Sequence, residues 1–262
     1  MLLDAPEEIA AVHDAYFAAG ARVATTASYQ ASVPGLVAAG LTREEAEAAI
    51  LRSVSLAREV RDAWAGDGVQ RLVAASVGPY GAYLADGSEY AGRYGRSAAE
   101  LREFHGPRME LLLSGEPDLL AVETVPDADE AEVLVGLLDE LDATGWLSYS
   151  VEADHTRAGQ PLEDAFAVAA GSRHLLAVGI NCSAPDDVLS AVRVAREVTG
   201  LPAVAYPNSG EAWVDKRWVG EAGFEPQQAR EWVAAGAAYI GGCCRVGPTQ
   251  IRALGEALSR AN

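Results

Sequence analysis

Three cysteines are the residues of this chain whose type and spacing indicate chemistry most directly. Cys243 and Cys244 are adjacent in the stretch YIGGCCRVGP, and Cys182 stands far upstream in GINCS. Three thiolates can hold a zinc ion and leave its fourth tetrahedral position open for a substrate. Sulfur ligands also favour zinc over magnesium or calcium. The cysteines therefore predict a catalytic zinc centre.

Other roles of the cysteines stay open on these grounds alone. Adjacent cysteines can be inert buried thiols, or they can form a disulfide. An odd number of cysteines in a chain without a recognisable export signal argues against a disulfide framework. His13 and His105 fall in expected helices, and His174 precedes an expected strand. Among the histidines, only His155 lies beyond an expected strand end, where a functional role stays open.

The elements that must position the cysteines follow one recurring pattern, a short apolar run followed by an amphipathic stretch. The expected strands lie at 21–28, 71–78, 118–124, 145–153, 175–182, 201–208 and 237–244. The expected helices lie near 6–19, 43–63, 97–114, 127–141, 161–170, 185–199, 225–235 and 248–260. Thr42 and Glu45 have the spacing of a capping box at the start of one helix.

Apolar runs without alternation, each followed by a helix, indicate a parallel sheet covered by helices. Seven such units after a leading helix predict an α/β fold, a (β/α)8 TIM-type barrel that lacks its first strand in this chain. The rival is an open doubly wound sheet, but neither GxGxxG nor a P-loop supports it. No linker divides the chain, so we expect one domain over residues 1–262.

Polar residues collect at the carboxyl ends of these strands, where a parallel barrel carries its active site. All three cysteines lie at such ends, so the barrel should bring them together. Gly241 and Gly242 are expected to let the backbone turn so that both adjacent cysteines face one ion. Glu123 directly follows an apolar run and should point into the mouth, where it would suit a substrate ammonium group. Pairing with an arginine or capping a helix are the alternatives for Glu123.

Composition limits the partners of the chain. The formal net charge is −18, which disfavours nucleic acid and anionic lipid surfaces. No apolar run is long enough to span a bilayer, and the first residues lack the basic region of a signal peptide. We therefore expect a cytoplasmic protein with small-molecule substrates. The sequence leaves the oligomeric state open, and an oligomer is compatible with it.

An ordered set of motifs resembles the homocysteine S-methyltransferase family. GINC, YPNSGE and GGCC occur in this order, with SVGPYGAYLADGSEY and ETVPDADEA upstream. The similarity runs from about residue 6 to the C-terminus. The chain length is more similar to the branch that uses S-methylmethionine or S-adenosylmethionine than to the betaine-dependent branch.

The resemblance implies a (β/α)8 barrel that transfers a methyl group from a sulfonium donor to homocysteine and yields methionine. It implies that Cys182, Cys243 and Cys244 hold a catalytic zinc ion. It further implies that Glu123 holds the amino group of homocysteine and that Asn181 shapes the substrate pocket.

The chain departs from the family pattern at its start, where we find no strand with an Asp-Gly-Gly motif. A barrel without that strand would have two unpaired edges, at 21–28 and 237–244. This departure keeps two alternatives open. One is a non-catalytic barrel that binds zinc or a partner, and the other is a methyltransferase that acts on another thiol or a selenol.

Overall fold

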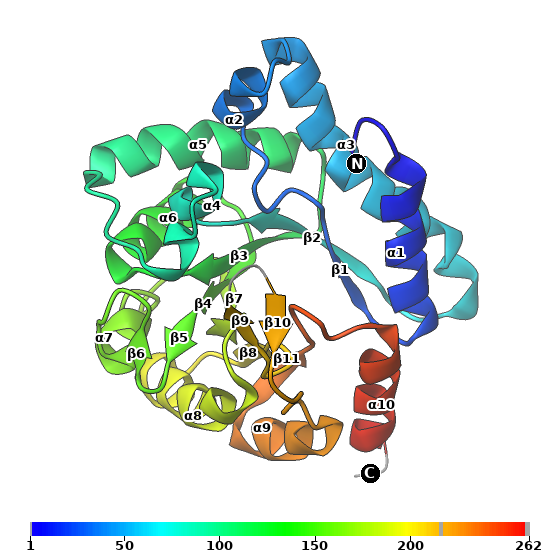
Figure 1. The fold of residues 1–262 in the computed structure, drawn as a ribbon, viewed down its shortest axis with the longest axis vertical. Coiled ribbons are helices and arrows are strands. Elements are labelled where there is room, and N and C mark those ends of the chain that lie inside the picture. The colour runs from blue at the N-terminus through cyan, green and yellow to red at the C-terminus, as the bar shows by residue number, and fades with distance from the viewer. Residues whose placement is uncertain (1, 215–216, 260–262) are drawn as a thin grey trace.

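A curled parallel sheet ringed by helices forms the centre of the molecule in this computed structural model, which describes residues 2–214 and 217–259 (Figure 1). The strands of this sheet are β1 Val23–Thr25, β2 Leu72–Val77, β3 Leu119–Val125, β4 Gly145–Tyr149, β7 Leu175–Asn181, β8 Ala203–Tyr206 and β11 Ala237–Ile240. They lie side by side in chain order, all in parallel. That order differs from an open doubly wound sheet, which reverses direction at a switch point. The architecture is consistent with a TIM-type barrel.

The predicted helices are present. The α-helices are α1 Pro6–Ala18, α2 Val33–Ala38, α3 Arg43–Ala63, α4 Tyr80–Leu84, α5 Ala98–Ser114, α6 Ala128–Glu140, α7 Leu162–Ala167, α8 Val188–Thr199, α9 Ala229–Ala235 and α10 Pro248–Ser259. The short 3-10 helices are η1 Ala65–Asp67, η2 Ser88–Tyr90, η3 Pro185–Asp187 and η4 Pro226–Gln228. Residue 260, the last of the predicted final helix, lies outside the described residues. In the part of the chain that the structure describes, no helix combines the length and apolar character needed to cross a bilayer.

Sequence reasoning missed four short features of the loops. They are the helices α2 and α4 and two antiparallel strand pairs, β5 Val151–Glu152 with β6 His155–Thr156 and β9 Ala212–Val214 with β10 Arg217–Val219. Elements of so few residues carry too little periodicity to be recognised. Helix ends were more predictable, because the capping box of Thr42 and Glu45 is confirmed at the start of α3.

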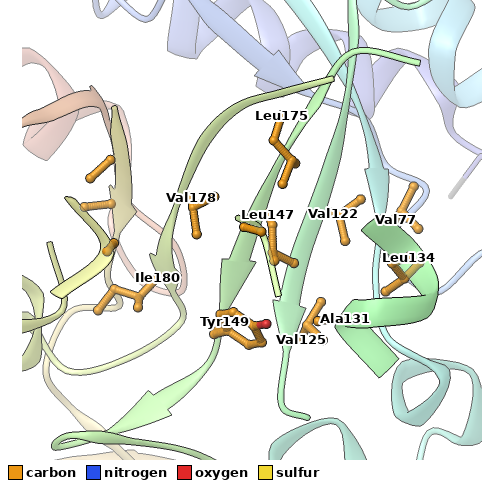
Figure 2. Packing of buried hydrophobic residues seen from close by; sticks show 14 of the residues in the cluster. Val77, Val122, Val125, Ala131, Leu134, Leu147, Tyr149, Leu175, Val178 and Ile180 are labelled. Atoms are coloured by element: carbon orange, nitrogen blue, oxygen red, sulfur yellow. The ribbon is translucent and has the colours of Figure 1, made fainter. Parts of the chain in front are cut away.

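Two apolar layers hold the sheet in place. The outer layer packs the sheet against the helices, and Figure 2 shows part of it, including Val122 and Leu147 from the strands and Leu134 from α6. The inner layer consists of alternate strand residues that face the inside of the curl. Its buried members are Ala74, Leu119, Ala121, Trp146, Ala177 and Val204. Gly179 belongs to β7, and any Cβ at this position would overlap with the backbone of Val204 on the neighbouring strand β8.

The two edges of the sheet face each other without pairing. In the described residues, β1 pairs with β2 alone and β11 pairs with β8 alone. A cavity of about 1130 Å³ lies between them, with walls from α1, β1, β11 and α10. The unpaired edges at 21–28 and 237–244 agree with the sequence expectation, while the absence of a first strand stays a prediction.

Candidate metal and substrate site

A row of polar side chains continues the inner layer of the sheet at the carboxyl ends of the strands. Alternation along a strand sends every second side chain to the same face. Counting in steps of two from the inner apolar residues leads to Ser76, Glu123, Ser148, Asn181 and Tyr206. The inner face of the curl is therefore apolar at one end and polar at the other.

Glu123 is the member of this polar row that β3 contributes. Its side chain is 7% exposed, and both carboxylate oxygens accept hydrogen bonds. Oε1 accepts a short bond from the Ser76 hydroxyl, and Oε2 accepts one from the Tyr206 hydroxyl at 2.9 Å. Tyr206 also receives a bond from Trp146 Nε1 at 3.0 Å and shares one with Ser148 at 2.8 Å. The carboxylate is thus held in one orientation by strands β2 and β8.

Burial raises the pKa of the Glu123 carboxyl, while bonds from Ser76 and Tyr206 and the charge of Arg108 oppose the rise. Arg108 is buried on α5 and donates to the backbone oxygens of Gly78, Ser28 and Tyr29 at 2.7–2.9 Å. Because these hydrogen bonds go to the backbone, Arg108 acts on Glu123 through space. The sequence had left open a direct pair between Glu123 and an arginine. In the structure, the Glu123 carboxylate is instead bonded to Ser76 and Tyr206. An added ammonium group would compensate the buried carboxylate.

Asn181 ends β7, and its amide holds neighbouring strands together. Oδ1 accepts from Thr124 N at 2.7 Å and from the Ser148 hydroxyl at 2.8 Å, and Nδ2 donates to the Thr124 hydroxyl at 2.7 Å. These bonds use both lone pairs of Oδ1 and one of the two amide hydrogens. Thr124 has a left-handed backbone with φ of 59°, which the clamp from Asn181 stabilises. Asn181 is therefore positioned to support Glu123 rather than to offer a free carbonyl oxygen to a substrate.

The three cysteines meet at the same end of the sheet as Glu123. Their Sγ atoms all lie within 4.8 Å of one another. Cys244 Sγ is 3.9 Å from Cys182 Sγ and 3.9 Å from Cys243 Sγ. Cys182 and Cys243 are joined in a disulfide, and Cys244 is free. The convergence agrees with the sequence prediction, whereas the disulfide differs from the expectation of reduced thiols.

The sulfur positions fit a tetrahedral metal ion once the disulfide is reduced. Zinc–sulfur bonds of about 2.3 Å in a tetrahedron place two sulfurs about 3.8 Å apart. The two separations from Cys244 are 3.9 Å, so two of the three sulfur pairs already have this spacing. Burial raises the pKa of the Cys244 thiol, which disfavours a thiolate unless a cation lies beside it. The donor set thus suits a soft divalent metal.

The backbone near the cysteines is fixed by bonds between β7, β8 and the segment after β11. Cys182 N donates to Tyr206 O at 3.2 Å, and Cys243 N donates to Pro207 O at 2.7 Å. The expected role of the two glycines needs correction, because neither Gly241 nor Gly242 has a positive φ. The left-handed residues are instead Cys182, with φ of 49°, and Arg245, with φ of 68°. Gly242 is required for space, because any Cβ there would overlap with the Val246 side chain.

Sequence reasoning missed the residues that support Glu123. Ser76, Arg108 and Tyr206 lie on three different elements, far apart in the sequence. Ser76 and Tyr206 could have been found by extending the two-residue alternation through the strand ends. Arg108 lies on a helix, and its sequence surroundings carry no signal that separates it from a surface arginine.

Comparisons with known proteins agree with this arrangement. The family model of homocysteine S-methyltransferase matches residues 1–258. Homocysteine S-methyltransferase of Escherichia coli (strain K12) is 45% identical over 264 residues, covering 97% of this chain and 85% of the relative. Two crystal structures of the homocysteine methyltransferase MmuM from Escherichia coli superpose on 97% of this chain at 43% identity. The metallated form has a TM-score of 0.87 over 85% of its chain, and the oxidized form has 0.88 over 86%.

These matches settle the class of the protein. The family model extends over nearly all of the chain, and the relative is well above the identity at which a family is shared. The prediction that the chain is an enzyme is confirmed, since the relatives are named as methyltransferases. The motifs around Cys182, Cys243 and Cys244 had indicated the same group. The chain belongs to the homocysteine S-methyltransferase family.

Proposed function

We propose that this protein transfers a methyl group from a sulfonium donor, S-methylmethionine or S-adenosylmethionine, to homocysteine and so forms methionine. The observation that carries the proposal is the meeting of three cysteine sulfurs within 4.8 Å of one another, at the end of the sheet that also carries the buried Glu123 carboxylate. Cys182 and Glu123 are linked through Tyr206, whose carbonyl receives Cys182 N and whose hydroxyl donates to Glu123. A thiol and an ammonium group of one small substrate can therefore be bound by one connected unit.

In its reduced form, the triad of Cys182, Cys243 and Cys244 would hold a zinc ion. When bound, zinc supplies a Lewis acid that lowers the pKa of a thiol placed in its open position. Soft ligands and the separations from Cys244 support this choice of metal.

Residues of the chain bind the substrate and orient it for the reaction. Glu123, fixed by Ser76 and Tyr206, binds the homocysteine ammonium group and orients its thiol. Homocysteine loses its thiol proton to solvent, and its sulfur forms a bond to the methyl carbon of the donor. The bond between that carbon and the donor sulfur breaks, and its electron pair stays on the donor sulfur. Because the leaving group is a neutral thioether, no general acid is needed.

The test uses reduced, zinc-loaded protein with homocysteine and each donor in turn, and methionine is measured by mass spectrometry. We expect methionine at enzymatic rates with at least one donor. Absence of methionine with both donors would contradict the proposal. Competition between homocysteine, cysteine and selenohomocysteine tests the acceptor, and a preference for another thiol or a selenol would replace homocysteine in the proposal.

A further inference from the structure

A further pair of polar and aromatic side chains lies on the loop that contains η2, between α4 and α5. η2 packs against β3, the strand that carries Glu123, and against α4. The packing on α4 is close, because a Cβ on Gly81 would lie 2.5 Å from Glu89 N. On the far side of the loop, Arg93 N donates to Asp127 Oδ2 at 3.0 Å, and Arg93 Nε donates to Ala158 O at 3.0 Å. The loop is therefore anchored at both ends.

Glu89 supplies a second carboxylate, on an element that contacts the strand of Glu123. Its Oε2 is buried and lacks a hydrogen-bond partner among the described residues. Burial raises the pKa of the Tyr29 hydroxyl, and the charges of Glu123 and Glu89 both add to the rise, so both carboxylates are within electrostatic range of this phenol. Glu123 has both of its oxygens bonded, whereas Glu89 keeps one buried oxygen without a bond. An unpaired buried carboxylate oxygen is costly unless a cation or donor comes to it.

Tyr90 provides an aromatic surface next to the sulfur cluster. Its side chain is 42% exposed, although it is a large aromatic residue held in a closely packed loop. Burial raises the pKa of its hydroxyl to about 12, and the Cys244 sulfur and the Glu89 carboxylate are close enough to add to that rise. The positive charge of Arg157 lowers the pKa of the Tyr90 hydroxyl. Arg157 Nη1 also lies 3.4 Å from Glu152 Oε2, whose negative charge partly offsets that of Arg157. A partly exposed aromatic ring with a carboxylate on the neighbouring residue and a cysteine sulfur nearby suits an organic cation.

We propose that Glu89 and Tyr90 form the subsite for the sulfonium cation of the methyl donor, opposite the subsite of Glu123 for homocysteine. This inference rests on the proposed function and adds the location of the second substrate. Methyl transfer brings together two substrates that each carry positive charge, and Glu123 and Glu89 supply two separate carboxylates. Tyr90 places the sulfonium against the sulfur cluster, where the accepting sulfur must lie. The same surface discriminates against the neutral thioether product, because loss of the positive charge removes both attractions.

The test measures binding and kinetics of Glu89→Gln and Tyr90→Leu, with Tyr90→Phe and Glu116→Gln as matched controls. Tyr90→Phe keeps the ring, and Glu116 is an exposed carboxylate that precedes β3 at its other end. S-Methylmethionine and its neutral analogue methionine are titrated into the reduced, zinc-loaded protein by calorimetry. We expect each of the two variants to bind S-methylmethionine about tenfold more weakly, with methionine binding unchanged. In turnover, the KM of the donor should rise by the same factor while the KM of homocysteine stays constant.

Two results would overturn the inference. One is unchanged S-methylmethionine binding in both variants, and the other is an equal loss for methionine, which would indicate a general disturbance of the mouth. The calorimetric readout separates this inference from the proposed function. Wild-type protein that binds S-methylmethionine through Glu89 but makes no methionine would keep the subsite and refute the reaction.

Discussion

The Glu123 half and the cysteine half of the mouth are built in different ways. On the side of β2, β3 and β4, Glu123 is 7% exposed, and each of its oxygens already accepts a hydrogen bond. On the side of β7 and β11, Cys243 and Cys244 are only partly buried, and β11 has no second strand partner in the described sheet. The carboxylate half is thus organised before a ligand binds. The sulfur half takes its geometry from what the sulfurs bind, which is one another in the disulfide or a metal in the proposed state.

This difference predicts that the two halves respond differently to substitution. Changes in the sulfur half should remove the metal and the reaction together. Changes in the Glu123 half should leave the metal in place and affect one substrate.

The largest effect is expected when any one of Cys182, Cys243 and Cys244 is changed to alanine. Loss of a group that only supports a ligand costs 10–100-fold in metal affinity, so loss of a ligand should cost more than about 100-fold. Methyl transfer should disappear at the same time. Metal content after gel filtration, measured by mass spectrometry, checks this prediction. One zinc ion per chain in all three variants would refute the ligand assignment.

The next effect is expected for Glu123→Gln. Loss of a charge-assisted bond to the homocysteine ammonium should raise the KM of homocysteine about 10–100-fold, with zinc content unchanged. Because burial raises the pKa of Glu123, ionisation of this carboxyl above that pKa lowers the free energy of unfolding. The neutral amide removes this cost, so the melting temperature at pH 8 should not fall. An unchanged KM of homocysteine would exclude Glu123 from the substrate site.

A smaller effect is expected from the two glycines before the cysteine pair. Gly242→Ala forces overlap with Val246 and should destabilise the protein by about 1–3 kcal/mol and weaken zinc binding. Gly241→Ala is the matched control, because the nearest atom to its Cβ would be Tyr206 Cβ at 3.5 Å, an ordinary contact. Zinc titration and thermal unfolding of both variants test this difference. Equal behaviour would show that the space at Gly242 does not shape the sulfur half.

The smallest effect is expected for Tyr206→Phe, which removes the hydrogen bond to Glu123 Oε2. That bond opposes the rise in the pKa of Glu123, so its loss should raise the pKa further. In the proposed function the carboxylate form of Glu123 binds homocysteine, so the acid limb of the pH profile of kcat/KM should move to higher pH. Tyr239→Phe, on the same inner face, is the control. A profile that does not move would separate Tyr206 from Glu123.

The fold and the sulfur half were more predictable from the sequence than the Glu123 half. Long apolar runs followed by helices are local patterns, and parallel strands bring their carboxyl ends together, so Cys182 could be placed beside Cys243 and Cys244. The network around Glu123 depends on side chains from separate elements. Arg108 on α5 acts on Glu123 through its charge, and the expectation that Asn181 shapes the substrate pocket did not include its bonds to Thr124 and Ser148. Such pairings depend on strand register and rotamers, which a single sequence does not encode locally.

The central claim is that three cysteine sulfurs hold one metal ion and leave a place for the sulfur of homocysteine. X-ray absorption at the zinc edge of the reduced, zinc-loaded protein tests it most directly. We expect three sulfur neighbours and one lighter atom at zinc, with four sulfur neighbours after homocysteine is added. Fewer than three sulfurs in the free protein, or an unchanged shell in the presence of homocysteine, would contradict it.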